Sequence, residues 1–459
     1  MELIMKLAPQ PLRGLAEQML KGQSHGARSG RGAISAFLVR VASAALMFVS
    51  QVAFARWLGA HDYGVFTFVL VLVNVIGTLC PAGFATSVVR FMPEYRERSE
   101  TGLARGFLLS GGIVSFSVGI LAAVAALAVL LGYDGLVSED YRIPIAVGLL
   151  SLPAFALTDY MDGVGRSQGW INLALTPPYI VRPCLILLFV GLALVAGFTN
   201  TAATAAMAAT VAIWVTMLAQ FLVLSRRFNG ELPQTPRRYD TKTWFWVSVP
   251  LVILEGFSIL LLNVDVLLLE RFVSPDQVGI YFAAARTISL IAFIHFAASA
   301  AVTPRFSALY ARGDIDGLKT LVREARKWTF LPSLAMAVIL LALGKPLLWL
   351  FGPDFTQGYP VMFALVVGLL ARAAVGPAQG LMVATGHQNI TAVVMIAAAV
   401  ANVVLNLLLV PEFGILGAGI ATSAALTLEA LTFAFIARRV LARAGTGLAH
   451  AKVHGSHVQ

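Results

Sequence analysis

Cysteine and charge are both scarce in this 459-residue chain. The only cysteines are Cys80 and Cys184. Both lie inside or at the end of apolar runs, so we interpret them as ordinary apolar packing and expect no disulfide framework and no metal site. Charged residues make up only 12% of the chain, whereas about 25% is typical of soluble domains. These shortages exclude a soluble globular protein.

Apolar residues take the place of charge and make up 58% of the chain. A helix needs about 20 mostly apolar residues to cross a bilayer, and windows of that kind recur along the sequence, separated by Gly, Pro and charged residues. They predict an all-α, polytopic membrane protein with 12 transmembrane helices. The predicted spans are residues 33–55, 64–88, 107–131, 143–163, 171–197, 202–225, 244–269, 279–302, 328–350, 358–384, 391–411 and 416–437.

The basic residues predict the orientation in the membrane. An even number of spans puts both termini on one side, and 25 of the 33 basic residues lie in the tails and loops of that side, against four on the other. Since Lys and Arg gather in cytoplasmic loops, we predict that both termini are cytoplasmic. This rule also explains most of the net charge of +10, so no nucleic-acid partner is expected.

The second half of the sequence repeats the first at an offset of 215 residues. Arg56-Trp57-Leu58 and Gly64-Val65-Phe66 correspond to Arg271-Phe272-Val273 and Gly279-Ile280-Tyr281. The repeat predicts two six-helix bundles around a central cleft that opens to either side in turn. The predicted division is a cytoplasmic tail (1–32), an N-terminal bundle (33–225), a cytoplasmic linker (226–243), a C-terminal bundle (244–437) and a second cytoplasmic tail (438–459).

Four arginines fall inside the predicted spans: Arg40, Arg182, Arg286 and Arg372. A charged side chain in lipid is costly and persists where it faces a bundle interior, a water-filled cavity or an acidic partner. We predict that these arginines line the cleft. Because a guanidinium stays charged and can hold two phosphate oxygens at once, the predicted cargo has an anionic head group. Arginines spread through the membrane's depth favour a head group that crosses between leaflets while its tail stays in lipid.

Polar residues form one stripe on each of two spans that correspond in the repeat. Ser43 and Gln51 share a face with Arg40 in the first span, and Ser258 and Asn263 belong to the stripe on the seventh. We predict that these side chains line the cleft.

Three acids inside the spans, Glu255, Asp265 and Glu429, are predicted to act in gating or cation coupling. A static Arg40–Glu255 pair that joins the two halves is the alternative for Glu255. No catalytic residue and no metal ligand is predicted.

Several phrases of the sequence resemble one family of membrane proteins. The first half contains Ala55-Arg56-Trp57-Leu58-Gly59, Asp62-Tyr63-Gly64-Val65-Phe66 and Arg90-Phe91-Met92-Pro93-Glu94-Tyr95. The second contains Val278-Gly279-Ile280-Tyr281 and Phe413-Gly414-Ile415-Leu416-Gly417-Ala418-Gly419-Ile420-Ala421-Thr422. These phrases are similar to those of the polysaccharide transporter family of lipid-linked oligosaccharide flippases. They belong to loops and packing positions and name no substrate.

The resemblance implies the fold shared by multidrug-and-toxin exporters and the lipid II flippase. It implies a flippase that moves an undecaprenyl-pyrophosphate-linked oligosaccharide, a polysaccharide repeat unit, across the bacterial inner membrane by alternating access. The expected partners are this carrier-linked glycan, membrane lipids, and polysaccharide polymerase and chain-length machinery. No cofactor is expected beyond a coupling ion, H⁺ or Na⁺.

Two other functions remain as alternatives. A drug/cation antiporter of the same superfamily is expected to carry an acid, not Arg40, in its first span. A membrane glycosyltransferase, polymerase or ligase would need a sizeable exported loop, whereas the longest one, near Gly132 to Arg142, has only about eleven residues. We therefore predict a transporter and not an enzyme.

Overall fold

The computed structural model describes the backbone of residues 25–133, 135, 137–231 and 235–455, and the side chains of 42–133, 135, 137–228 and 235–442. Every regular element in these residues is a helix, which confirms the all-α fold class. The elements are α3 (His25–Leu79), α4 (Phe84–Glu97), α5 (Thr101–Gly132), α6 (Glu139–Leu149), α7 (Leu152–Ser167), α8 (Ile171–Thr176), η1 (Pro177–Val181), α9 (Arg182–Val195), α10 (Ala202–Glu231), α11 (Thr241–Phe272), α12 (Pro275–Ile288), η2 (Ser289–Ile291), α13 (Ala292–Ala311), α14 (Ile315–Ala342), α15 (Gly344–Phe351), η3 (Asp354–Gly358), α16 (Tyr359–Val375), α17 (Ala378–Ala384) and α18 (Gln388–Gly455).

The two longest helices, α3 and α18, each fold back at a glycine. Gly59 and Gly414 have positive φ angles of 78° and 54°, which glycine adopts without a steric penalty. Residues twelve or twenty positions apart in a straight helix would be separated by about 18 or about 30 Å. Instead, the Tyr63 hydroxyl donates to Gln51 Oε1 at 3.0 Å, and Thr422 Oγ1 lies 3.4 Å from Asn402 Oδ1. Each of these helices therefore contains two passes.

The helical stretches are consistent with the predicted number of passes. Nine helical stretches of the described residues are long and apolar enough to cross a membrane, and the bent pair α6–α7 adds a tenth. Two of the nine contain the folds at Gly59 and Gly414, so the arrangement is consistent with 12 spans. The chain is a multi-pass membrane protein.

The two cysteines have different surroundings. Cys80 is buried, and its thiol donates to the Ile76 carbonyl oxygen at 3.1 Å. Cys184 on α9 is exposed, so the expectation of ordinary packing is wrong for it. Leu188 and Leu192 follow on the same side of α9 and are also exposed, as expected where a helix faces lipid rather than protein.

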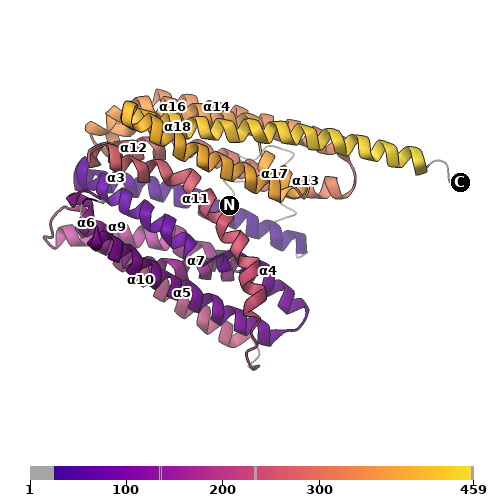
Figure 1. Cartoon of the computed structure of the whole chain (residues 1–459), viewed down its shortest axis with the longest axis horizontal. Helices are drawn as coiled ribbons and strands as arrows, with labels where there is room; N and C mark the ends of the chain where they lie inside the picture. The colour runs from indigo at the N-terminus through magenta and orange to yellow at the C-terminus, as the bar shows by residue number, and fades with distance from the viewer. Residues whose placement is uncertain (1–24, 134, 136, 232–234, 456–459) are drawn as a thin grey trace.

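The helices form two lobes (Figure 1). The first lobe runs from α3 to α10 and lies below the second, α12 to α18, in the view of that figure. The lobes lie close together at the end that carries α6 and α12 and are farther apart at the end that carries α4 and α13. At the close end, α3 packs directly on α12.

Residues that correspond in the repeat meet at this close end. A Cβ added to Gly64 would lie 1.8 Å from the Pro275 carbonyl oxygen, and one added to Gly279 would lie 2.8 Å from the Ala60 carbonyl oxygen. His61 Nδ1 lies 3.4 Å from Asp276 Oδ2. Gly64 and Gly279 are 215 residues apart, as are His61 and Asp276. Matching residues that face each other are the mark of an isologous contact, so a pseudo-twofold axis passes between α3 and α12.

Helix α11 joins the two lobes. In its first half, the Trp244 indole N–H donates to the Tyr95 hydroxyl at 2.7 Å, and Ser248 Oγ lies 2.8 Å from Ser87 Oγ. In its second half, the Leu261 carbonyl oxygen accepts from Asn402 Nδ2 at 3.1 Å. The first half of α11 therefore packs on the first lobe and the second half on the second lobe. Figure 1 shows α11 crossing from one lobe to the other. The bundle boundaries at 225 and 244 stay a prediction.

Candidate anion cavity between the lobes

A cavity of about 200 Å³ lies between the lobes. The first lobe lines it with side chains of α3, α7, η1, α9 and α10, the second with side chains of α12, and α11 adds Asn263. Four of the side chains predicted for the cleft are among the lining residues: Gln51, Arg182, Asn263 and Arg286. Since they come from both halves of the sequence, the cavity exists only where the lobes meet.

Arg182 enters the cavity from a distorted stretch of helix. Pro177 and Pro178 have no amide hydrogens to donate, and residues Pro177–Val181 form the π-helical turn η1 directly before α9 begins at Arg182. The Arg182 guanidinium carbon lies 4.7 Å from the centre of the Phe155 ring. This cation–π contact orients the guanidinium without neutralising its charge.

Arg286 faces the same cavity from α12 and has a similar support. Its guanidinium carbon lies 4.7 Å from the centre of the Phe282 ring, one helical turn earlier. Arg286 also lines a neighbouring cavity of about 120 Å³, together with Asp265 and Thr422. It therefore lies between the central cavity and Asp265 of α11.

The charged side chains that line the central cavity are both positive. Among the residues that the structure describes, neither Arg182 nor Arg286 forms an ion pair. The buried Ser50 Oγ and Asn74 Oδ1 also line or border this cavity without a hydrogen-bond partner. Charges and polar groups that are removed from water need partners. The arrangement therefore suits an anionic ligand that also carries hydroxyl groups. Our sequence reasoning did not select Asn74, although an asparagine inside an apolar span was a visible signal.

Arg372 and Glu429 lie together, away from this cavity. Arg372 Nη2 on α16 is 3.8 Å from Glu429 Oε1 on α18, and the Glu429 side chain is only 1% exposed. A buried carboxylate without a cationic partner would be strongly destabilising. The ion pair therefore accounts for both charged residues by a structural role. Neither residue lines the cavity that holds Arg182 and Arg286.

The remaining predicted residues have other surroundings. Ser43 is buried on α3, and Ser258 donates to the Leu254 carbonyl oxygen of its own helix at 2.7 Å; neither lines the central cavity. Glu255 accepts a hydrogen bond from Thr86 Oγ1 on α4. Arg40 lies in α3, but its side chain is outside the described residues, so its pairing with Glu255 stays a prediction.

Asp265 is the centre of a buried network of oxygen atoms. Its Oδ2 accepts from the Tyr281 hydroxyl and from Thr422 Oγ1, the latter at 3.3 Å. Thr422 Oγ1 also contacts Asn402 Oδ1, which accepts from Asn406 Nδ2 at 2.8 Å. Asn406 Oδ1 is buried without a partner. Carboxylate, amide and hydroxyl oxygens are ligands that hard cations prefer.

Asn402 and Asn406 were absent from the sequence predictions. They are four residues apart, so they share one face of a helix. This spacing inside an apolar span could have identified them.

Two helical lobes around a central cavity, with an internal repeat, define a multi-pass membrane transporter. The family described as "Polysaccharide biosynthesis protein" matches residues 29–310, which is more than half of the chain. The chain belongs to this family. A second family model, MatE, matches residues 250–408.

Individual relatives agree with this class. The chain is 24% identical over 400 residues to "Putative O-antigen transporter" of Shigella flexneri, with 84% of this chain and 92% of the relative covered. It is 21% identical over 399 residues to "Probable low-salt glycan biosynthesis flippase Agl15" of Haloferax volcanii, with 86% and 80% covered. The structure titled "Lipid II flippase MurJ, inward closed conformation" has the same fold, with a TM-score of 0.70, 15% identity and coverage of 88% and 87%. The relatives are named as transporters or flippases and not as enzymes, and the chain is a flippase-type transporter.

Proposed function

We propose that the protein flips an undecaprenyl-pyrophosphate-linked oligosaccharide across the bacterial inner membrane by alternating access. The main support is one observation: Arg182 and Arg286, from opposite lobes, line one cavity, and neither forms a salt bridge among the described residues. A pyrophosphate supplies the missing negative charge, and its oxygens match the fork of a guanidinium. The oligosaccharide hydroxyls find partners in Ser50 Oγ and Asn74 Oδ1, which are buried without a hydrogen-bond partner.

The names of the relatives support the same cargo class, since they refer to O-antigen and to glycan biosynthesis. In this proposal both termini face the cytoplasm, and the flipped unit passes to a polysaccharide polymerase and its chain-length machinery. The drug/cation antiporter is disfavoured, because a cationic drug in the central cavity would be repelled by two arginines.

Depletion of the protein in its host tests the cargo. We expect lipid-linked oligosaccharide to accumulate on the inner leaflet and surface polysaccharide to disappear. The accumulated glycan, released and identified, gives the repeat unit. Unchanged lipid-linked pools together with greater sensitivity to cationic dyes would instead favour the antiporter.

The proposal includes a coupling cation, H⁺ or Na⁺, at Asp265. Asp265 and Arg286 line the same 120 Å³ cavity, so a cation on Asp265 weakens its attraction for Arg286. The guanidinium is then free to hold the anionic cargo. Cation binding at Asp265 thereby promotes cargo binding between the lobes, which is a coupling between two sites.

Asp265→Asn should lower transport by roughly 5- to 150-fold, the usual range for loss of a coupling between sites, and should remove its dependence on sodium or pH. Uptake of an undecaprenyl-pyrophosphate-linked oligosaccharide into proteoliposomes, with sodium and pH varied on one side, measures both. Asp316→Asn is the control, because Asp316 is exposed and its salt bridge among the described residues is with the nearby, exposed Lys319. Full ion dependence in the Asp265→Asn variant would contradict the coupling role.

A further inference from the structure

A second large cavity, of about 250 Å³, lies within the first lobe between α5, α7 and α10. Its walls are apolar and include Leu108, Leu157 and Phe221. Tyr160 contributes only its ring, because its hydroxyl donates to the Leu108 carbonyl oxygen at 3.2 Å. None of the residues that line the central cavity between the lobes lines this one. The cavity has no role in the transport mechanism described above.

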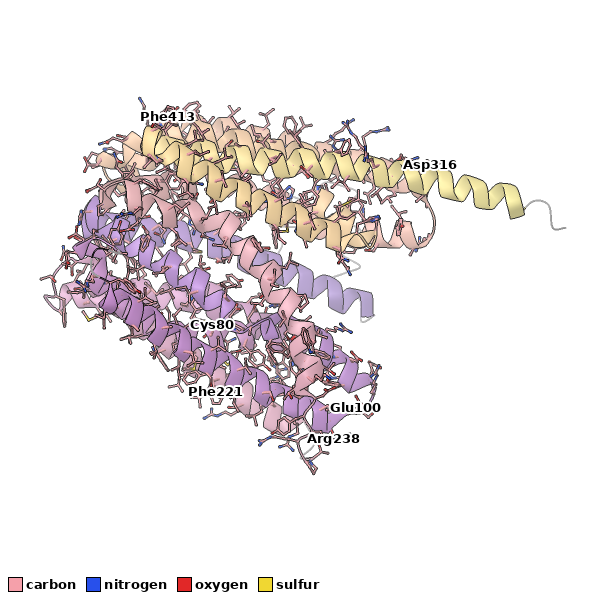
Figure 2. All side chains as sticks on the ribbon, in the orientation of Figure 1. Cys80, Glu100, Phe221, Arg238, Asp316 and Phe413 are labelled. Carbon is pink, nitrogen blue, oxygen red and sulfur yellow. The ribbon has the colours of Figure 1, made fainter. Side chains whose placement is uncertain are left out.

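The cavity faces the outside of the lobe. Phe221 is 47% exposed, and its neighbours Leu218 and Leu222 are exposed as well. Figure 2 shows Phe221 on the side of the first lobe that points away from the second lobe. In a membrane-spanning helix such as α10, an exposed apolar surface of this kind contacts the hydrocarbon of the bilayer. A lipid chain can therefore enter the cavity sideways.

Two arginines, Arg105 and Arg237, complete the cavity, and no acid is among its described lining residues. Arg105 is near the start of α5 and donates to the Thr235 carbonyl oxygen, while Arg237 is exposed. Both belong to the basic segments that the sequence predicts to be cytoplasmic. Apolar walls with two cations at one end match an amphiphile that has a negative head group.

We propose that this cavity binds one anionic phospholipid of the cytoplasmic leaflet. The phosphate contacts Arg105 and Arg237, and one acyl chain fills the space beside Phe221. The walls do not suit the oligosaccharide cargo, because apart from the two arginines they are almost entirely apolar and offer few polar groups to sugar hydroxyls.

The second lobe contains a smaller cavity of the same construction. It lies between α14, α17 and α18 and has two arginines, Arg326 and Arg438, but its volume is only about 60 Å³. Arg326 Nε donates to the Ala374 carbonyl oxygen at 3.1 Å. Since this space is too small for an acyl chain, we expect no lipid there. The duplication thus supplies a matched control within the same molecule.

The test is native mass spectrometry of the purified full-length protein, exchanged into vesicles of phosphatidylglycerol or phosphatidylethanolamine before extraction. We expect one tightly retained phosphatidylglycerol. The double variant Arg105→Gln, Arg237→Gln should weaken its retention by about 25-fold, since each basic residue contributes about fivefold to anionic lipid binding. The matched variant Arg326→Gln, Arg438→Gln should retain the lipid as the unchanged protein does.

A second variant tests the cavity without removing charge. A Cβ on Gly112 would lie 3.8 Å from both Leu157 and Tyr160, so Gly112→Leu places its side chain in the cavity without a backbone clash. It should lose the lipid while both arginines remain. Equal retention in all variants, equal retention of phosphatidylethanolamine, or a polyprenyl phosphate as the retained species would each overturn the proposal. These outcomes do not depend on which glycan the protein moves.

Discussion

Replacing Arg182 or Arg286 with glutamine will stop glycan export while the protein still folds. Each arginine lines the central cavity without a salt bridge among the described residues, so in the proposed function the cargo's pyrophosphate is its counter-charge. Removing one member of a buried, hydrogen-bonded charge pair costs about 2–5 kcal/mol, which corresponds to a loss of roughly 30-fold or more. Surface polysaccharide in complemented deletion strains, and flipping in proteoliposomes, measure the loss.

Two further substitutions separate charge from folding. Arg286→Lys keeps the positive charge but not the two-pronged geometry, so it should retain part of the activity. Arg271→Gln removes an exposed arginine at the end of α11 and should change transport by less than about twofold. Normal export by Arg182→Gln and Arg286→Gln would show that the cavity does not hold the cargo.

Thermal stability distinguishes the cargo arginines from a structural one. Arg182 and Arg286 form no salt bridge among the described residues, so their removal should leave the melting temperature unchanged or higher. Arg372→Gln should behave differently, because it leaves the buried Glu429 without its partner. Breaking such a pair costs about 3–5 kcal/mol. A detergent-solubilised thermal melt of the three variants measures the difference, and equal losses for all three would contradict the division into cargo and structural roles.

The position of an arginine in a span was readable from the sequence, but its partner was not. Apolar windows and basic loops located Arg182, Arg286 and Arg372 in spans, because hydropathy depends only on neighbours along the chain. Arg372 and Glu429 meet because α16 packs against α18. That contact depends on which helix faces lie together, and hydrophobic periodicity does not determine it.

The internal repeat has the same limit, because it gives positions along the chain but not the contacts between helices. The offset of 215 residues was visible because Gly64 and Gly279 each begin a similar phrase. The sequence did not reveal that the two glycines touch, or that α11 belongs to both lobes. The contacts of Glu255 with Thr86 and of Ser248 with Ser87 fasten the first half of α11 to the first lobe. Rocking of one lobe against the other must therefore bend α11 or break these contacts.

Gly64→Ala will force the lobes apart at the end where they now meet. The added Cβ would lie 1.8 Å from the Pro275 carbonyl oxygen, and neither backbone can yield without moving its helix. Such overpacking costs about 1–3 kcal/mol, which shifts a two-state equilibrium by roughly 5- to 150-fold. We expect the closed arrangement of this end to be depleted and transport to fall by a similar factor, because alternating access needs both arrangements.

Distances between spin labels at residues 199 and 354 can report this change. Thr199 and Asp354 are exposed and lie in different lobes. The free cysteines Cys80 and Cys184 would be replaced by serine, so that only the introduced cysteines carry a label. Gly64→Ala should lengthen the distance between the labels. Gly132→Ala is the matched control, since a Cβ there meets nothing within 4 Å, and it should leave the distance unchanged. The prediction would be contradicted if Gly64→Ala gave the same distances and the same transport rate as the control. In that case the contact between Gly64 and Pro275 would not close this end of the cavity, and another contact between α3 and α12 would have to close it.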